Sequence, residues 1–235
     1  MEKKQVIGKG ACGIVFKDKL NGEDVAVKLI KKQKHDEESV LLKLGAHPNI
    51  VPFYGSFEHD YKKYIVFGLC ERIPKRMNKN DAKQVGRHVL RAIRHCHTQG
   101  YRHGDIKRAN IMIFNKRYVV IDFGYCTRES DATGMGTVDY FAPELCHRHP
   151  SLIKENDIWA LGVVLFQLLH GCTPFEEDSV SKTKNNIQKV KIVNIDRWNS
   201  LDDVGKDFFN QIFILDPKKR ATTDQLLDHS WLQKE

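Results

Sequence analysis

The chain has 235 residues, of which 41% are hydrophobic and 29% charged, and it carries a formal net charge of +8. This length and composition exclude a disordered, collagen-like or low-complexity chain, and they suffice for one large domain or two small ones, each with a buried core. The longest nearly apolar run, residues 159–169, has eleven residues, whereas a membrane helix needs about 20. The first ten residues contain no apolar signal segment. We therefore expect an intracellular protein, cytoplasmic or nuclear, that is neither secreted nor transmembrane.

The six cysteines lie at least 20 residues apart and form no C-x-x-C pair, which favours free thiols over a zinc site or a disulfide scaffold. Charge is unevenly distributed along the chain. Residues 71–120 hold 13 basic and 3 acidic side chains, whereas residues 121–235 hold 13 and 18. The basic region could attract an acidic or phosphorylated partner, although a solvated helix face is the simpler interpretation. No aromatic interleaving or base-reading motif favours a nucleic acid.

The first 70 residues read as strands interrupted by one short helix. An Asn21-Gly22 turn between alternating segments is a strong hairpin signal. The helix is predicted over residues 36–45, with Asp36 as its N-cap and Gly45 at its end. Strands are expected at 6–10, 13–20, 23–30 and twice within 56–69.

From about residue 80 the pattern becomes helical. A helix capped by Asn80 or Asp81 and ending before Gly100 is predicted to be amphipathic, because its apolar residues recur at i, i+3 and i+4. These apolar positions are Ala82, Val85, Val89, Ala92, Ile93 and Cys96. Residues 157–170 are apolar almost all round and predict a buried helix. Short strands are expected at 110–114 and 118–122, and further helices near 201–215 and 223–231. The sequence therefore predicts an α+β fold class, with a small β-rich lobe followed by a larger helical lobe.

Three glycines, Gly8, Gly10 and Gly13, form a G-x-G-x-x-G pattern that would let the backbone approach a phosphate closely. A strand follows Gly13, whereas a dinucleotide-binding loop would lead into a helix, and the Gly-Lys-Ser/Thr ending of a Walker loop is missing. A glycine hairpin over a nucleotide remains. Lys28 ends the apolar run VAVK and could direct its ammonium group at phosphates while its stem stays packed.

The segment HGDIKRAN, residues 103–110, places Asp105, Lys107 and Asn110 close together. Twelve residues after Asn110, Asp122 begins the segment DFG, directly after the apolar strand YVVI. A carboxylate beside an amide oxygen suits Mg²⁺, which takes oxygen ligands and shares them with the phosphates of a nucleotide. A lone loop aspartate is more often a turn or cap residue, so the argument depends on the whole set.

These motifs are followed by GTVDYFAPE at 136–144, DIWALG at 157–162 and Arg220 in LDPKKRAT. In this order and spacing, over about residues 5–232, the chain resembles the catalytic domain of a eukaryotic-type protein kinase, and Lys107 with Gly136-Thr137 is typical of the serine/threonine class. GTVDYFAPE and the compactness of the chain also resemble kinases of large DNA viruses, including the baculovirus type. The resemblance implies a single kinase domain over 1–235: a small antiparallel sheet with one helix over about 1–67, a hinge at about 68–71, and a mainly helical lobe over about 72–235.

The resemblance also implies an activity, the transfer of the γ-phosphate of ATP, with Mg²⁺, to serine or threonine hydroxyls of a protein substrate. Asp105 would be the catalytic base and Lys107 would balance charge on the transferring group. Lys28 would bind the α- and β-phosphates and pair with a glutamate, best read as Glu38, with Glu37 as the alternative. Asn110 and Asp122 would hold Mg²⁺. The nucleotide would be bound by Ile7, Gly8, Lys9, Gly10, Ala11, Cys12, Gly13, Ile14, Val15, Ala26, Lys28, Phe67, Leu69 and Cys70.

Other residues have structural roles in the resembling family. Leu42, His103 and Phe123 would stack as core, and Asp157 would hold the backbone of the loop at 103–110. Glu144 would pair with Arg220 inside the large lobe.

Gly104 stands where most kinases have an arginine that pairs with a phosphate on the activation segment. We therefore expect activity that does not depend on phosphorylation of that segment, at Thr127, Ser130, Thr133 or Thr137. A pseudokinase-like docking or scaffold protein that regulates another kinase is the alternative function, and it would need a damaged nucleotide site.

Overall fold

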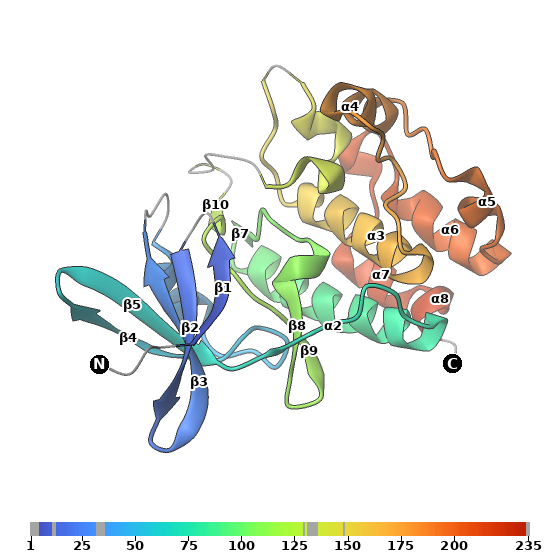
Figure 1. Cartoon of the computed structure of the whole chain (residues 1–235). Coiled ribbons are helices and arrows are strands. Elements are labelled where there is room, and N and C mark those ends of the chain that lie inside the picture. Colours follow the sequence, from blue (N-terminus) through green and yellow to red (C-terminus); the bar gives the residue numbers. More distant parts are fainter. Residues whose placement is uncertain are drawn as a thin grey trace.

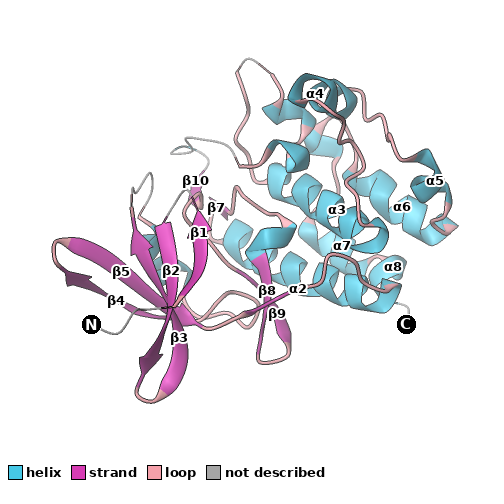
Figure 2. Ribbon diagram, viewed as in Figure 1, coloured by secondary structure: helices cyan, strands magenta, loops and turns pink. Residues whose placement is uncertain are grey.

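The computed structural model describes residues 5–10, 13–31, 36–128, 130, 136–147 and 149–233. A β-sheet made by the first part of the chain lies beside a mainly helical C-terminal region, with α2 (Lys79–Thr98) and a small sheet between them (Figure 1). Most of the strands lie on one side of the molecule and most of the helices on the other (Figure 2). The predicted α+β fold class is thereby confirmed.

The N-terminal sheet is antiparallel, with the strand order β1-β2-β3-β5-β4. Asn21 and Gly22 both have positive φ, 51° and 88°, as a two-residue hairpin turn between β2 and β3 requires. Each predicted strand is present. Their bounds are β1 (Val6–Gly10), β2 (Gly13–Leu20), β3 (Glu23–Ile30), β4 (Phe53–His59) and β5 (Lys62–Gly68).

The helix α1 (Glu37–Leu44) lies between β3 and β4 in the chain. Gly45 follows its end with a φ of 68°, as predicted. Asp36 is the N-cap residue, as predicted, but its side chain makes no capping hydrogen bond to a described residue.

The helix α2 begins after Asn78, so the prediction of Asn80 or Asp81 as its cap is wrong. The side chain of Asn78 accepts a hydrogen bond from Asp81 N at 2.9 Å. The predicted apolar positions of this helix, Ala82, Val85, Val89, Ala92, Ile93 and Cys96, are all buried. Two small sheets lie near α2. One pairs β7 (Tyr101–Arg102) with β10 (Thr127–Arg128). The other has three strands, β6 (Glu71–Arg72), β8 (Ile111–Phe114) and β9 (Arg117–Val120).

The C-terminal region is built around α3 (Glu155–His170), which is buried along most of its length, as its apolar sequence predicts. Trp159 of this helix stacks on Phe175 at 5.3 Å between ring centroids and lies edge-on to Phe213 at 5.1 Å. The remaining helices are α4 (Val180–Gln188), α5 (Ile195–Asn199), α6 (Asp203–Ile212), α7 (Thr223–Asp228) and α8 (Ser230–Gln233). In the part of the chain that the structure describes, no helix is long and apolar enough to cross a bilayer.

Candidate active site

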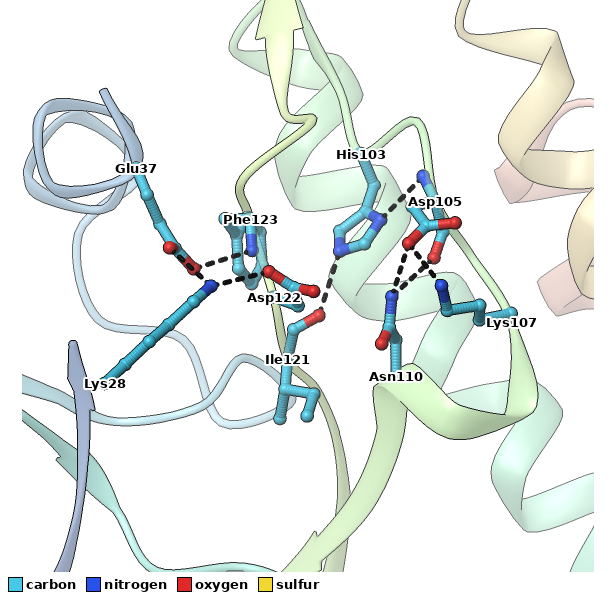
Figure 3. Close-up of polar contacts among 9 residues, drawn as sticks. All are labelled: Lys28, Glu37, His103, Asp105, Lys107, Asn110, Ile121, Asp122 and Phe123. Carbon is cyan, nitrogen blue, oxygen red and sulfur yellow. Dashed lines mark hydrogen bonds and ion pairs between the residues drawn. The ribbon is translucent and has the colours of Figure 1, made fainter. Parts of the chain in front are cut away.

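Lys28 lies in the middle of the N-terminal sheet, on β3, where it pairs with Val15 of β2 and Ile65 of β5. Its ammonium contacts two carboxylates: Nζ lies 2.7 Å from Glu37 Oε2 and 2.7 Å from Asp122 Oδ1 (Figure 3). Burial alone would lower the pKa of Lys28, but the two adjacent carboxylates outweigh it and raise the pKa above its ordinary value. Lys28 is therefore a fixed cation that joins α1 to the segment after β9.

The partner of Lys28 on α1 is Glu37, and the prediction of Glu38 is wrong. Glu37 is only 2% exposed, and its Oε1 also accepts a hydrogen bond from Phe123 N at 3.0 Å. Glu38 instead forms an ion pair with Lys63 of β5. Successive positions of a helix differ in direction by about 100°, so two adjacent glutamates cannot both face Lys28.

The apolar spacing of α1 contained the signal that would have selected Glu37. Glu37, Val40, Leu41 and Leu44 are spaced at i, i+3, i+4 and i+7, so they share one face of a helix, and all four are buried. Leu42 is 64% exposed, so its predicted place in the core is wrong. Leu41, one position earlier, lies in the main hydrophobic core.

The loop at 103–110 brings its polar groups together around Asp105. Asp105 Oδ2 lies 2.7 Å from Lys107 Nζ and accepts a hydrogen bond from Asn110 Nδ2 at 3.0 Å. Lys107 also donates to Thr137 Oγ1 at 3.2 Å. A Cβ at Gly136 would lie 2.5 Å from Asp105 Oδ1, so glycine is needed where this segment passes the aspartate. The segment at 136–137 is thus held directly over Asp105.

Asp157 fixes the backbone of this loop, as predicted. Its carboxylate accepts hydrogen bonds from His103 N and Gly104 N, each at 2.8 Å, and lies 2.9 Å from His97 Nε2. Burial would raise the pKa of Asp157, but these hydrogen bonds and the nearby imidazoles hold the pKa below its ordinary value. The ring of His103 lies edge-on to Phe123 at 4.9 Å, which confirms this part of the predicted core stack.

Asp122 and Asn110 present oxygen atoms that suit a hard cation. Asp122 has a φ of 62°, in the left-handed region that is strained for a residue with a Cβ. Its carboxylate is 26% exposed, and its Oδ1 contacts Lys28. Among the hydrogen bonds of the described residues, none uses the second Asp122 oxygen or the side-chain oxygen of Asn110. Two such oxygens fit Mg²⁺.

The residues predicted to bind the nucleotide lie on the strands that flank Lys28. Ala26 lies two positions before Lys28 and on the same face of the sheet. Val15 is the cross-strand neighbour of Lys28. Phe67 of β5 pairs with Ala26, and Leu69 and Cys70 follow that strand. Ile7, Gly8, Lys9 and Gly10 lie on β1 and Gly13, Ile14 and Val15 on β2, whereas Ala11 and Cys12 lie outside the described residues.

The buried ion pair predicted in the large lobe is present. Arg220 Nη1 and Nη2 lie 2.8 and 3.0 Å from the two carboxylate oxygens of Glu144. Asn156 donates to the same carboxylate at 2.7 Å, and Arg220 also donates to the backbone oxygens of Glu155 and Ile214. This network ties the segment at 136–145 to α3 and to the C-terminal helices.

Part of the charge of the basic region is neutralised within the chain. Lys79 and Arg94 of α2 form ion pairs with Asp202 and Asp224, which belong to the acidic part of the sequence. Arg87 donates to the backbone oxygen of Leu232. The uneven charge along the sequence therefore serves in part to hold α2 against the C-terminal helices.

Residues 1–232 match the family described as the protein kinase domain. A CDPK-related protein kinase of Daucus carota is 33% identical, over 97% of this chain and 43% of its own length. Calcium/calmodulin-dependent serine/threonine-protein kinase 1 of Oryza sativa subsp. japonica is 34% identical, over 97% of this chain and 43% of its own. Maternal embryonic leucine zipper kinase of Danio rerio is 30% identical, over 98% and 37%.

The chain spans less than half the length of these relatives. They are plant and fish proteins, and the resemblance to viral kinases finds no support among them. The family match covers almost the whole chain, and the antiparallel sheet with its helix and the mainly helical C-terminal region have the architecture of that family. The chain therefore has the protein kinase fold and belongs to the protein kinase domain family.

Proposed function

We propose that the chain transfers the γ-phosphate of ATP to serine or threonine hydroxyls of a protein substrate. The observation that carries this proposal is the position of the Lys28 ammonium, 2.7 Å from both Glu37 and Asp122. A buried cation held in this way by two carboxylates is ready to bind phosphate oxygens. The relatives named above are kinases by name, and one is named as a serine/threonine kinase.

In the proposed reaction the carboxylate of Asp105 accepts the proton of the substrate hydroxyl while that oxygen attacks the γ-phosphorus. The bond from the γ-phosphorus to the β–γ bridging oxygen breaks, and ADP leaves. Lys107, 2.7 Å from Asp105, balances negative charge on the transferring group. Lys28 holds the α- and β-phosphates, and Glu37 keeps its ammonium in place. Asp122 and Asn110 would hold Mg²⁺, which neutralises phosphate charge when bound.

The nucleotide and metal residues support an active enzyme over the docking alternative, because a damaged site would have lost at least one of them. The test is phosphate transfer from labelled ATP with Mg²⁺ to basic and acidic model proteins, using protein made in bacteria. We expect transfer by the wild type and by Asp60→Asn, an exposed carboxylate in the β4–β5 turn. We expect none by Asp105→Asn. The absence of transfer by the wild type would contradict the proposal, and the absence of ATP binding as well would favour the docking alternative.

We propose that this activity does not require phosphorylation of the activation segment. Gly104 stands at the position of the phosphate-pairing arginine. Of the four residues that could be phosphorylated, Thr127 is buried on β10 and Thr137 accepts a hydrogen bond from Lys107. Thr133 lies outside the described residues. Phosphatase treatment and the double substitution Ser130→Ala/Thr133→Ala should leave kcat within about threefold of the untreated wild type. A tenfold or larger fall would contradict this.

The predicted acidic or phosphorylated partner of the basic region stays a proposal. Several of its basic side chains, among them Lys79, Arg87, Arg94 and Lys107, already have partners within the chain, so the charge that is left for such a partner is smaller than the sequence count implies.

A further inference from the structure

The side chain of Arg102 occupies the space beside Gly104. Arg102 lies on β7 and is 1% exposed, which makes it one of the largest fully buried side chains of the molecule. A Cβ placed on Gly104 would lie 2.6 Å from Arg102 Nη1 and 3.1 Å from Arg102 Cζ. It would also lie 3.0 Å from the backbone oxygen of Tyr125. A side chain at position 104 and the guanidinium of Arg102 therefore compete for one space.

That space lies between the loop that carries Asp105 and the chain that follows Asp122. On one side, the backbone nitrogen of Gly104 donates a hydrogen bond to the Asp157 carboxylate, and Asp105 is the next residue. On the other side, β7 pairs with β10 so that Arg102 faces Thr127. The guanidinium is rigid, planar and always charged, and its five donors can bridge segments in a way that an aliphatic side chain cannot. It is thus placed to fix the Asp105 loop relative to the segment after Asp122.

We propose that Arg102 is a positioning residue that replaces, from two residues earlier, the arginine missing at position 104. Its buried guanidinium sets the backbone of Gly104 and thereby the direction of Asp105. This inference rests on the proposed kinase activity. Because the cation belongs to the buried interior of the chain, the arrangement needs no phosphate added to the activation segment.

The same geometry predicts that positions 102 and 104 are coupled. Gly104 has a φ of 81°, so alanine there is strained by its backbone as well as by contact with Arg102. Arg102→Met removes the guanidinium and with it the contact, but not the backbone strain. The double variant Arg102→Met/Gly104→Ala should therefore lose less thermal stability than the sum of the two single losses.

The experiment measures kcat, KM for ATP and Tm for the wild type, Arg102→Met, Arg102→Lys, Gly104→Ala and the double variant. The matched control is Arg128→Met, which removes an exposed arginine of the same β7–β10 pair. We expect Arg102→Met to lower kcat at least about tenfold with KM for ATP within about threefold, since Lys28 and Asp122 keep their contacts. Arg102→Lys should recover part of the rate, and Arg128→Met should stay within about twofold of the wild type.

Three results would overturn the proposal. One is an active wild type whose kcat is unchanged by Arg102→Met. Another is a loss of activity on phosphatase treatment in the wild type but not in Arg102→Met, because Arg102 would then bind a phosphate on the activation segment. The third is strict additivity of the Tm losses, which can be measured without any activity and with Arg102→Lys if Arg102→Met does not fold. A wild type without phosphate transfer refutes the kinase proposal instead, and Tm still decides the coupling of positions 102 and 104.

Discussion

Replacement of the adjacent glutamates of α1, one at a time, tests the geometry of the site directly. Glu37→Gln keeps the shape of the side chain and an oxygen that can accept from Phe123 N, but it removes the charge that faces Lys28. Glu38→Gln makes the same chemical change one residue later, where the partner is Lys63. The pair is therefore matched in chemistry and differs only in the direction in which the side chain points.

The size of each effect follows from burial. The Lys28 and Glu37 side chains are 9% and 3% exposed, and a charge-assisted hydrogen bond in such a place contributes about 1.5–3 kcal/mol. If Lys28 positions phosphates in the transition state, Glu37→Gln should lower kcat/KM by about 10- to 150-fold. The Lys63–Glu38 pair is about a quarter exposed on each side, and such pairs contribute about 0.2–1 kcal/mol. Glu38→Gln should therefore change kcat/KM by at most about fivefold.

The assay is steady-state phosphate transfer at varied ATP concentration, with Tm measured to show that both variants are folded. Equal losses in the two variants, or a larger loss in Glu38→Gln, would refute the assignment of Glu37 as the partner of Lys28. Normal activity in Glu37→Gln would refute the proposed role of the Lys28 ion pair itself.

Three further predictions concern stability. Leu41→Ala should cost about 2–5 kcal/mol in urea unfolding, whereas exposed Leu42→Ala should cost less than about 0.5 kcal/mol, and the reverse order would contradict the helix phase described here. Glu144→Gln leaves the buried guanidinium of Arg220 without its charged partner and should cost about 3–5 kcal/mol; a loss below about 1 kcal/mol would mean that the pair is dispensable. Burial, with nearby imidazole and arginine charges, lowers the pKa of His47 to about 4 from 6.5. Between these two pH values the unfolded chain binds more protons than the folded chain, so the free energy of unfolding should fall as the pH drops from 6.5 to 4. His47→Gln should reduce that fall by about 1 kcal/mol after allowance for solvent screening. An unchanged dependence of the free energy of unfolding on pH would contradict this.

Local sequence signals determined much of the architecture. The Asn21-Gly22 pair specified a turn with two positive φ values, and the structure has them. The i, i+3, i+4 spacing of α2 placed six apolar residues on one face, and all six are buried. These signals can be read from the sequence because each depends on residues within a few positions of one another.

Polar helices could not be predicted, because they lack such local signals. The short helices α4 and α5 carry no strong apolar periodicity, and the sequence did not predict them. Ser179 caps α4 by accepting a hydrogen bond from Lys182 N at 3.3 Å, and Thr183, Asn186 and Ile187 are buried on it. Its mixed polar and apolar contacts become visible only when the rest of the chain is in place.

The sequence by itself determined the family, the order of the motifs and the chemical groups available at the site: Lys28, Asp105, Asn110 and Asp122 could all be named from it. Only the tertiary structure decided which of two adjacent glutamates faces Lys28, and that the guanidinium of Arg102 fills the space at Gly104. The physical reason is that these contacts join segments distant in the chain, and their partners are set by the phase in which helices and strands pack. Adjacent residues of a helix point in directions about 100° apart, so Glu37 is buried and Glu38 is partly exposed to solvent although the two are chemically identical neighbours in the sequence.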